Sequence, residues 1–325
     1  MRVPVYPERS VADAGRYAPS PSGPLHLGNL RTALLAWLAA RSRGAPFHLR
    51  IEDLDRERCR PEHERSQLAD LAALGLDWDG PVVRQSDRLE EHRDAFEQLR
   101  AAGRVYPCWC TRGDIREAAA APHLAVPHLA SGARRYPGTC RELGRDERRR
   151  RARETGREPV WRLDGRSERV SFDDLLRGPC EGIVDDVVLW RADDAPAYNL
   201  AVVVDDDAQS VGEVVRGEDL IDATPMQALI ADILALTRPV YLHVPLVLGA
   251  EQRRLAKRDG AITLRERLAA GETVAQVIAW LARSAGLARP GEPTTLDALL
   301  TVFEPRRLAR EPVILSPRGP LQVRG

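Results

Sequence analysis

The chain of 325 residues lacks any apolar run close to the roughly 20 residues that are needed to cross a bilayer. Its first residues also lack the apolar core of a signal peptide, so we expect a cytoplasmic protein without membrane association. Net charge is absent as well, because 48 Lys and Arg balance 48 Asp and Glu. Overall charge therefore gives no argument for a nucleic-acid partner, and any RNA contact must use a local basic patch and the shape of the RNA.

Cysteine is scarce, and the chain has no internal repeats. The five cysteines are an odd number, which in a cytoplasmic protein favours free thiols or metal ligands over a disulfide framework. A hydrophobic fraction of 43% is ordinary for a globular protein, and the chain is long enough to bury a core. These properties predict two domains, or one large domain with an insertion.

Residues 16–29 are the most informative stretch, with the sequence Arg-Tyr-Ala-Pro-Ser-Pro-Ser-Gly-Pro-Leu-His-Leu-Gly-Asn. Its prolines prevent a helix from beginning before about Leu27, and leucines then recur at helical spacing. A rigid loop that leads into a helix N-terminus suits a phosphate, because free N–H groups and the helix dipole point at it. His26 lies at that helix start, and Gly28 lets a ligand approach the backbone. The alternative is a proline-rich turn with an incidental histidine.

Strands and helices alternate along much of the chain, which is typical of an α/β protein with a parallel sheet. Thr224 is the expected N-cap of one helix. Glu52 follows a strand, where open α/β sheets bind ligands, although a solvated turn would also take an acid there. We expect strands over 47–51, 196–206, 211–215 and 241–248, and helices over 61–74, 89–102 and 225–236.

Residues 104–194 interrupt this alternation and are predicted to be an insertion. The segment begins with a loop-rich part and ends with short alternating strands. Between them, residues 141–157 mix arginine with glutamate, which is typical of a solvated helix; a contact surface for an RNA backbone is the alternative. The predicted domains are therefore 1–103 with 195–250, the insertion 104–194, and a signature loop with a helical region over 251–325.

Cys108 and Cys110, one residue apart, can bind a single ion together with Cys140. Zinc prefers four ligands in a tetrahedron, with thiolates among them. Buried free thiols are the alternative. Spacing leaves the fourth ligand open among three candidates: Tyr136, His123 and His128.

A basic loop over residues 249–260 is the second stretch that suggests chemistry. It contains Arg-Leu-Ala-Lys-Arg-Asp-Gly over 254–260. Near a nucleotide, Lys257 would neutralise the charge that develops on phosphates during adenylyl transfer. A solvated basic loop without a ligand is the alternative.

Residues 16–29 resemble the first signature of the class I aminoacyl-tRNA synthetases, in particular the glutamyl type, in which Arg-Phe-Ala-Pro-Ser-Pro-Thr/Ser-Gly precedes a His-x-Gly-His box. Asn29 stands in place of the last histidine. Residues 254–258 resemble the second signature, Lys-Met-Ser-Lys-Ser, in degenerate form, and only Lys257 matches the catalytic lysine. Together with the insertion, the resemblance covers about residues 14–260.

This resemblance implies a Rossmann-type catalytic domain with an inserted, zinc-containing, acceptor-binding-like subdomain and a small C-terminal helical region. It implies that His26 and Lys257 are catalytic, and that they bind ATP and its Mg²⁺ together with Gly28 and Asn29. It points to Tyr136 as the fourth ligand of one structural Zn²⁺, beside the three cysteines. For the glutamate pocket it implies Arg16, Tyr17, Ala18, Pro19, Ser20, Glu52, Tyr198 and Arg216.

About 65 residues follow the basic loop, where a full glutamyl-tRNA synthetase has a long region that reads the anticodon. The shorter architecture resembles the branch of the family that activates glutamate with ATP and esterifies it onto the queuosine of tRNA(Asp). One alternative is a shortened glutamyl-tRNA synthetase that charges tRNA(Glu). The other is a non-catalytic, zinc-stabilised RNA-binding paralogue. For all three interpretations we expect a monomer.

Overall fold

A computed structural model describes residues 13–120, 135–249, 251–253, 255 and 262–315. Its centre is a seven-stranded sheet in which neighbouring strands run parallel, except for the last pair, β6 and β7. In sheet order the strands are β3 (Val83–Arg84), β2 (Phe47–Ile51), β1 (Ala14–Tyr17), β9 (Val211–Gly217), β10 (Val240–Val244), β6 (Arg169–Asp174) and β7 (Gly178–Ile183).

The strand order reverses direction between β1 and β9. From β1 the chain continues to β2 and β3 on one side, whereas β9 is followed by β10 on the other side. The carboxyl ends of β1 and β9 therefore form a topological switch point, which is where open parallel sheets bind ligands. This confirms the α/β class and the parallel sheet predicted from the sequence.

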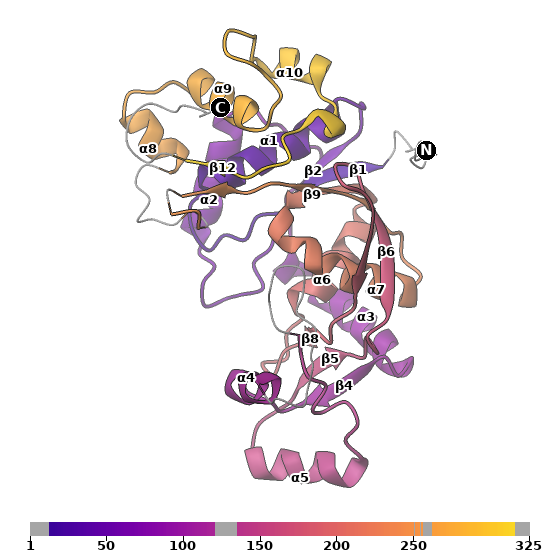
Figure 1. The fold of residues 1–325 in the computed structure, drawn as a ribbon. Coiled ribbons are helices and arrows are strands. Elements are labelled where there is room, and N and C mark those ends of the chain that lie inside the picture. Colours follow the sequence, from indigo (N-terminus) through magenta and orange to yellow (C-terminus); the bar gives the residue numbers. More distant parts are fainter. Residues whose placement is uncertain (1–12, 121–134, 250, 254, 256–261, 316–325) are drawn as a thin grey trace.

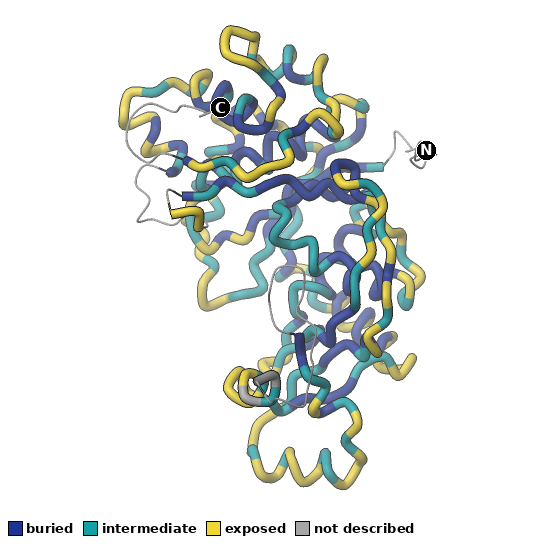
Figure 2. Tube along the Cα trace, viewed as in Figure 1, coloured by how far each residue is buried: buried dark blue, intermediate teal, exposed yellow. Residues whose placement is uncertain are grey.

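Helices cover both faces of the sheet (Figure 1). The central helix α1 is apolar on almost every side, so it is buried by neighbours on all of its faces. Figure 2 shows α1 and the central strands as the most deeply buried part of the chain. One face carries α1 (Leu27–Arg41), α8 (Leu264–Ala269), α9 (Val274–Ser284) and α10 (Leu296–Val302), and the other carries α3 (Leu89–Ala101), α6 (Tyr198–Ala208) and α7 (Thr224–Ile233). Helix α2 (Pro61–Ala73) packs near α1, and the short β11 (Val247–Leu248) pairs in parallel with β12 (Val313–Ile314).

The prediction of a buried strand over residues 196–206 is wrong, because this segment forms helix α6. Three consecutive valines favour a strand, but propensity is a weak determinant that tertiary contacts override. In the helical form Leu200 packs in a core with α3 and α7. Helical geometry also turns Asp205 and Asp206 inward, onto the buried guanidinium of Arg50.

Most other predicted elements are confirmed within one to three residues at their ends. The exception is the segment 241–248, which divides into β10 and the short β11. Thr224 is not the N-cap of α7: the helix begins at this residue, and its hydroxyl accepts a hydrogen bond from Arg216 instead.

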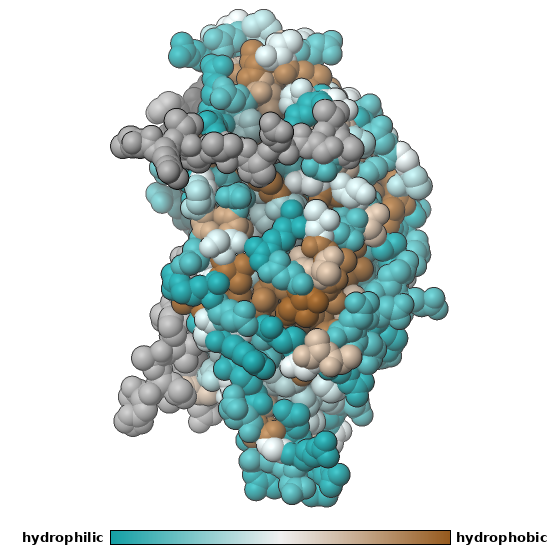
Figure 3. Space-filling model, turned by 90° about the vertical axis from the view of Figure 1, so that its right-hand side faces the viewer, coloured by the Kyte–Doolittle hydropathy of each residue, from teal (hydrophilic) through white to brown (hydrophobic). Residues whose placement is uncertain are grey.

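Within residues 104–194, three short strands form an antiparallel sheet of their own, whereas the β6–β7 hairpin joins the main sheet. The arginine-rich stretch forms α5, none of whose side chains is buried, which confirms an exposed helix and fits both of the roles expected for it. It lies at one end of the molecule, and that end is almost uniformly hydrophilic in Figure 3. The elements of this segment outside the main sheet are β4 (Val105–Cys108), α4 (Arg112–Ala120), α5 (Arg145–Thr155), β5 (Val160–Leu163) and β8 (Val188–Trp190).

None of the described helices is both long enough and apolar enough to cross a membrane.

Candidate functional site

A cleft of about 730 Å³ opens at the carboxyl ends of β1, β2 and β9. Its volume is typical of a site for a small molecule or cofactor. The loop that follows β1 forms one wall, and the residues that end β9 and follow β10 form another. The fold thus places the cleft at the switch point of the sheet.

His26 is fixed at the start of α1 by a reciprocal cap with Asn29. The Asn29 backbone N–H donates to His26 Nδ1, and the His26 backbone N–H donates to Asn29 Oδ1, both at 3.2 Å. A Cβ on Gly28 would lie 3.0 Å from two atoms of the His26 ring, so any larger residue would push the ring from this position by a few tenths of an ångström. Because Nδ1 accepts, the neutral ring carries its proton on Nε2 and presents a donor there.

Arg16 and Glu52 lie together on one side of the cleft, above a buried guanidinium. Arg50 is fully buried and contacts Glu52 at 3.3 Å and Asp206 at 2.8 Å. Arg16 approaches Asp206 at 3.4 Å and donates to the backbone oxygen of Val215. Burial raises the pKa of Glu52, an effect that the two arginines oppose. This side offers an anionic oxygen beside a guanidinium, which suits an ammonium group next to a carboxylate.

Asp205 extends the buried charge network away from the cleft. Its carboxylate accepts hydrogen bonds from Gln85 at 2.9 Å, from Arg88 at 2.7 Å and from His92 at 2.9 Å. These contacts join α6 to the start of α3, so the position of the Glu52 side of the cleft depends on both helices.

Arg216 lies on the opposite side of the cleft and comes from the end of β9. Its guanidinium donates to Gln227 Oε1 at 2.7 Å, to Thr224 Oγ1 at 2.8 Å and to His243 Nε2 at 3.0 Å. Tyr198 also lines the cleft and comes from the first turn of α6 rather than from a strand. Burial raises the pKa of Tyr198, so its phenol stays protonated and can donate a hydrogen bond.

The structure brings nearly all the predicted small-molecule ligands into this one cleft. Lys257 lies outside the described residues, although Leu255 of the same loop is among the cleft residues. The ligand-binding roles of the residues stay predictions. Those that line the cleft are Arg16, Tyr17, Ala18, Pro19, Ser20, His26, Gly28, Asn29, Glu52, Tyr198 and Arg216.

Several supporting residues were missed from the sequence. Runs of Asp at the end of the 196–206 segment were a signal, but they were assigned to a strand end. The partners of Arg216 gave no local signal, because each comes from a different element. The missed residues are Arg50, Asp174, Asp205, Asp206, Thr224, Gln227 and His243.

The predicted metal ligands lie together in a second place, within residues 104–194. The Sγ atoms of Cys108, Cys110 and Cys140 all lie within 4.8 Å of one another. The Tyr136 hydroxyl lies 3.3 Å from Cys108 Sγ and 3.5 Å from Cys110 Sγ. Sulfurs around a tetrahedral zinc are separated by about 3.8 Å, so three sulfurs and one oxygen at these spacings fit the ion. His123 and His128 lie outside the described residues.

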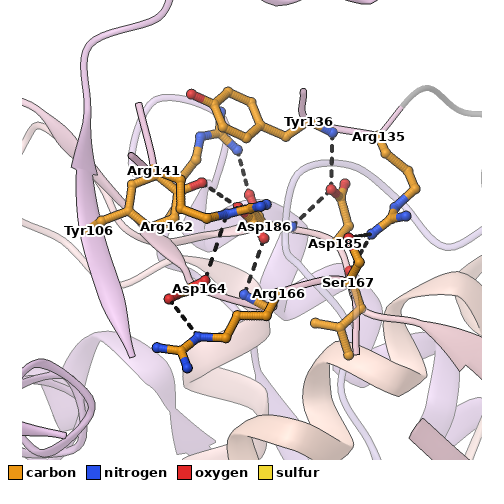
Figure 4. Close-up of polar contacts among 12 residues, drawn as sticks. Tyr106, Arg135, Tyr136, Arg141, Arg162, Asp164, Arg166, Ser167, Asp185 and Asp186 are labelled. Atoms are coloured by element: carbon orange, nitrogen blue, oxygen red, sulfur yellow. Dashed lines mark hydrogen bonds and ion pairs between the residues drawn. The ribbon is translucent and has the colours of Figure 1, made fainter. Parts of the chain in front are cut away.

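Tyr136 is held in place from behind by charged residues (Figure 4). Its backbone N–H donates to Asp185 at 3.0 Å, and the Arg162 guanidinium lies 4.0 Å from the centre of its ring. Asp186 accepts hydrogen bonds from Tyr106 and from Arg141. Asp185 and Arg162 thus help to position the tyrosine from outside the cysteine cluster, and its hydroxyl also accepts from the backbone N–H of Cys140 at 3.0 Å.

Comparison with known proteins gives consistent matches over most of the chain. Residues 14–286 match the family described as "tRNA synthetases class I (E and Q), catalytic domain". The glutamyl-Q tRNA(Asp) synthetase of Nocardia farcinica is 55% identical over 96% of each chain. That of Symbiobacterium thermophilum is 47% identical over 92% of this chain and 94% of its own.

A solved structure is similar as well. The crystal structure of a glutamate tRNA ligase from Elizabethkingia meningosepticum, in complex with its amino acid, superposes with a TM-score of 0.76. It is 25% identical and covers 94% of this chain, whereas this chain covers 67% of the ligase.

The central charge network leads to a prediction for Arg50→Met. Removing the guanidinium leaves three buried carboxylates without their shared cation, so the free energy of unfolding should fall by about 3–5 kcal/mol. Burial already raises the pKa of Glu52, and Arg50 is the larger of the two charges that oppose this effect, so without Arg50 the folded-state pKa of Glu52 lies further above its unfolded value and the variant gains stability as the pH falls. Urea unfolding should show the deficit shrinking between about pH 7 and about pH 5.

The control is Arg93→Met, which removes the half-exposed ion pair with Asp194. An exposed pair contributes about 0–1 kcal/mol, so this variant should differ little from the natural protein. Equal losses in both variants would contradict the importance of the Arg50 network.

Proposed function

Because the chain belongs to the class I tRNA synthetases of the glutamate and glutamine type, and within them to the glutamyl-Q tRNA(Asp) synthetases, we propose that it joins glutamate to an RNA in two steps. Glutamate and ATP first form glutamyl-adenylate, and the glutamate then passes to the queuosine of tRNA(Asp). The observation that carries the proposal is that an Arg- and Glu-lined pocket and a capped helix N-terminus open into the same cleft.

Glutamate binds between the two sides of the cleft. Its ammonium group pairs with Glu52, and a carboxylate pairs with the Arg216 guanidinium, whose planar fork suits that geometry. Tyr198 donates to a substrate oxygen, and Arg16 with Ser20 completes the wall beside β1. Both charged ends of the amino acid thus meet a group of the opposite sign.

ATP places its phosphates at the N-terminus of α1, where backbone N–H groups and the helix dipole favour anions. The glutamate α-carboxylate attacks the α-phosphate, the bond to the bridging oxygen breaks, and pyrophosphate leaves. His26, which presents a donor at Nε2, and Lys257 stabilise the charge on the phosphate oxygens. Mg²⁺ enters with ATP as part of the substrate. No protein nucleophile is needed, because positioning and electrostatics supply the catalysis.

In the second step a hydroxyl of the queuosine cyclopentene ring attacks the acyl carbon of glutamyl-adenylate. The ester bond forms, the bond between the acyl carbon and the AMP oxygen breaks, and AMP leaves. The open side of the cleft must therefore admit an RNA nucleotide as well as the small substrates.

We place a structural zinc ion on Cys108, Cys110, Tyr136 and Cys140. Three sulfurs and a phenolic oxygen converge there, and Asp185 with Arg162 holds the tyrosine in place. When bound, the ion would join the strand that ends at Cys108 to the loop that contains Cys140. It lies outside the cleft and takes no part in the reaction steps.

We divide the chain into a catalytic domain at 1–103 with 195–250, an insertion at 104–194 and a C-terminal region at 251–325, and we place the RNA along the insertion. Helix α5 supports this placement, because it carries six arginines against three acids and none of its side chains is buried. Phosphate contacts to such a helix fix the register of an RNA without reading its sequence. We also propose that the protein is a monomer and that it acts in the cytoplasm, where ATP and tRNA are both present.

The activity is tested by transfer of labelled glutamate, with ATP, onto tRNA(Asp) that contains or lacks queuosine, and onto tRNA(Glu). We expect label only on queuosine-containing tRNA(Asp). Lys257→Ala should reduce the rate by about 100-fold or more, because a charge that stabilises the transferring phosphate is removed. Arg253→Ala, in the same loop but paired with Glu251 at the surface, should change the rate by less than about 3-fold.

Two other outcomes would contradict the proposal. Label at the 3′ end of tRNA(Glu) would identify a shortened glutamyl-tRNA synthetase. Failure of glutamate to support exchange of pyrophosphate into ATP would identify a non-catalytic binding protein.

The zinc site is tested by metal analysis of the purified protein. We expect one zinc per chain, lost in Cys140→Ser and retained in Cys180→Ser, which changes a cysteine away from the cluster. Cys140→Ser should also unfold at a lower temperature, because the ion no longer ties the two segments together. If the natural protein contains no zinc, and Cys140→Ser unfolds at the same temperature as the natural protein, the three cysteines are buried free thiols instead of metal ligands.

The role of α5 is tested by replacing the exposed Arg149, Arg151 and Arg153 with alanine. If they contact phosphates, KM for tRNA should rise, and the slope of log KM against log salt should fall by about 0.7–0.9 for each phosphate that is no longer neutralised. Pyrophosphate exchange without RNA should be unchanged, since α5 is remote from the cleft. An unchanged salt slope would leave α5 as a solvated helix only.

A further inference from the structure

Three polar side chains from neighbouring strands form a line that ends at the cleft. Arg216 on β9 pairs in the sheet register with His243 on β10, and Asp174 ends β6 on the far side of β10. Arg216 Nε lies 3.0 Å from His243 Nε2, and His243 Nδ1 lies 2.8 Å from Asp174 Oδ2. Arg216 is 5% exposed, and the other two are not exposed at all.

The chemistry of the three groups determines where the proton of the imidazole lies. Arginine can only donate, so His243 Nε2 must offer a lone pair to it. The neutral ring then carries its proton on Nδ1, where the Asp174 carboxylate accepts it. A protonated ring would place an N–H against the N–H of Arg216. Burial lowers the pKa of His243 to about 4, which keeps the ring neutral around pH 7.

Asp174 is itself held by the backbone, so it cannot turn away from His243. Its Oδ1 accepts from the N–H groups of Leu176 at 3.0 Å and Arg177 at 2.8 Å. Its Oδ2 accepts from the backbone N–H of His243 at 2.9 Å as well as from the ring. The aromatic ring of Tyr241 stacks on His243 and lies beneath the Arg216 guanidinium.

The interposed imidazole also preserves the charge of Arg216. Among the described residues, the acceptors for its guanidinium are His243, Gln227, Thr224 and the backbone oxygen of Leu220, all of them neutral. A carboxylate bonded directly to Arg216 would compete with a substrate carboxylate for the same N–H groups. Because His243 lies between Asp174 and Arg216, the Arg216 guanidinium is oriented but its charge is not neutralised by a bonded carboxylate.

We propose that His243 and Asp174 are positioning residues that orient the Arg216 guanidinium for the carboxylate of glutamate. This inference rests on the proposed function for its substrate, although the hydrogen-bonded chain itself does not. Asp174 belongs to the segment 104–194, so the amino-acid pocket depends on a strand contributed by the segment on which we place the RNA.

The proton position is tested first by ¹⁵N NMR of imidazole-labelled protein, which needs no substrate. The natural protein should show His243 protonated on Nδ1 and not on Nε2. In Asp174→Asn we expect the side-chain oxygen to stay with the backbone N–H groups of Leu176 and Arg177, so that the NH₂ group takes the place of Oδ2 and faces His243 Nδ1. Because this NH₂ group donates, we expect the imidazole proton to move to Nε2, against Arg216. A charged ring, or protonation on Nε2 in the natural protein, would overturn the proposal.

Kinetics then separate positioning from stability. In glutamate-dependent pyrophosphate exchange, Asp174→Asn should raise KM for glutamate by about 10–100-fold, as for other residues that orient a ligand-binding group. KM for ATP should stay within about 2-fold, because the ATP end of the cleft lies at α1. Asp173→Asn, exposed and adjacent on the same strand, should change neither constant. An unchanged KM for glutamate with the expected proton shift would overturn the positioning role.

A second pair of variants covers the case in which Asp174→Asn does not fold. His243→Gln keeps an oxygen that can accept from Arg216, whereas His243→Leu removes the acceptor. We expect KM for glutamate to rise less in the glutamine variant than in the leucine variant, and equal values would contradict the proposal. If the natural protein shows no glutamate-dependent exchange, the proposed function fails, while the NMR result still tests the hydrogen-bonded chain.

Discussion

The cleft depends on one buried cation, Arg50, shared among carboxylates from different parts of the chain. Its guanidinium is fully buried and contacts Asp206 from α6 and Glu52 from the loop after β2. A buried charge is tolerated only where it is paired and hydrogen bonded, so these groups must assemble together or not at all. This constraint fixes α6 against the sheet and sets the position of Glu52 in the cleft.

The departure from the family signature at Asn29 has a structural explanation. Asparagine closes the cap of α1 by accepting from the His26 backbone while its own N–H donates to the His26 ring. The backbone N–H of residue 29 holds the His26 ring, and the Asn29 side chain adds an acceptor for the His26 backbone N–H. The four residues from His26 to Asn29 therefore keep His26 fixed at the start of α1, although they contain one imidazole fewer than the family signature.

Much of the fold could be predicted from the sequence because it depends on local patterns. Prolines and periodic leucines located α1, and apolar runs located β2, β9 and β10. Helix α6 could not be predicted this way, because its valines favour a strand, whereas core packing against α3 and α7 and the ion pair with Arg50 depend on residues that are distant in the sequence. The cysteines were found from their spacing, since one ion requires them to lie close together.

The supporting residues of the pocket could not be predicted, because their partners are remote in sequence. His243 and Asp174 are 69 residues apart and meet only because β6 pairs with β10. Arg216 itself was assigned from the resemblance, but nothing local indicated that its neighbours would be an imidazole, an amide and a hydroxyl. Local patterns predict elements, whereas contacts of this kind follow from how the strands are ordered.

The pairing of β6 with β10 also limits how this protein can be recombined. An inserted segment that contacts its parent domain only where the chain enters and leaves it can be exchanged as a unit. Here the hairpin of β6 and β7 covers the edge of the central sheet, and excising residues 104–194 would expose the β10 edge. Unpaired strand edges invite association with other chains, so a chimera that replaces this segment must supply a strand to cover β10. The segment on which we place the RNA and the proposed amino-acid pocket are thus expected to be inherited as one unit.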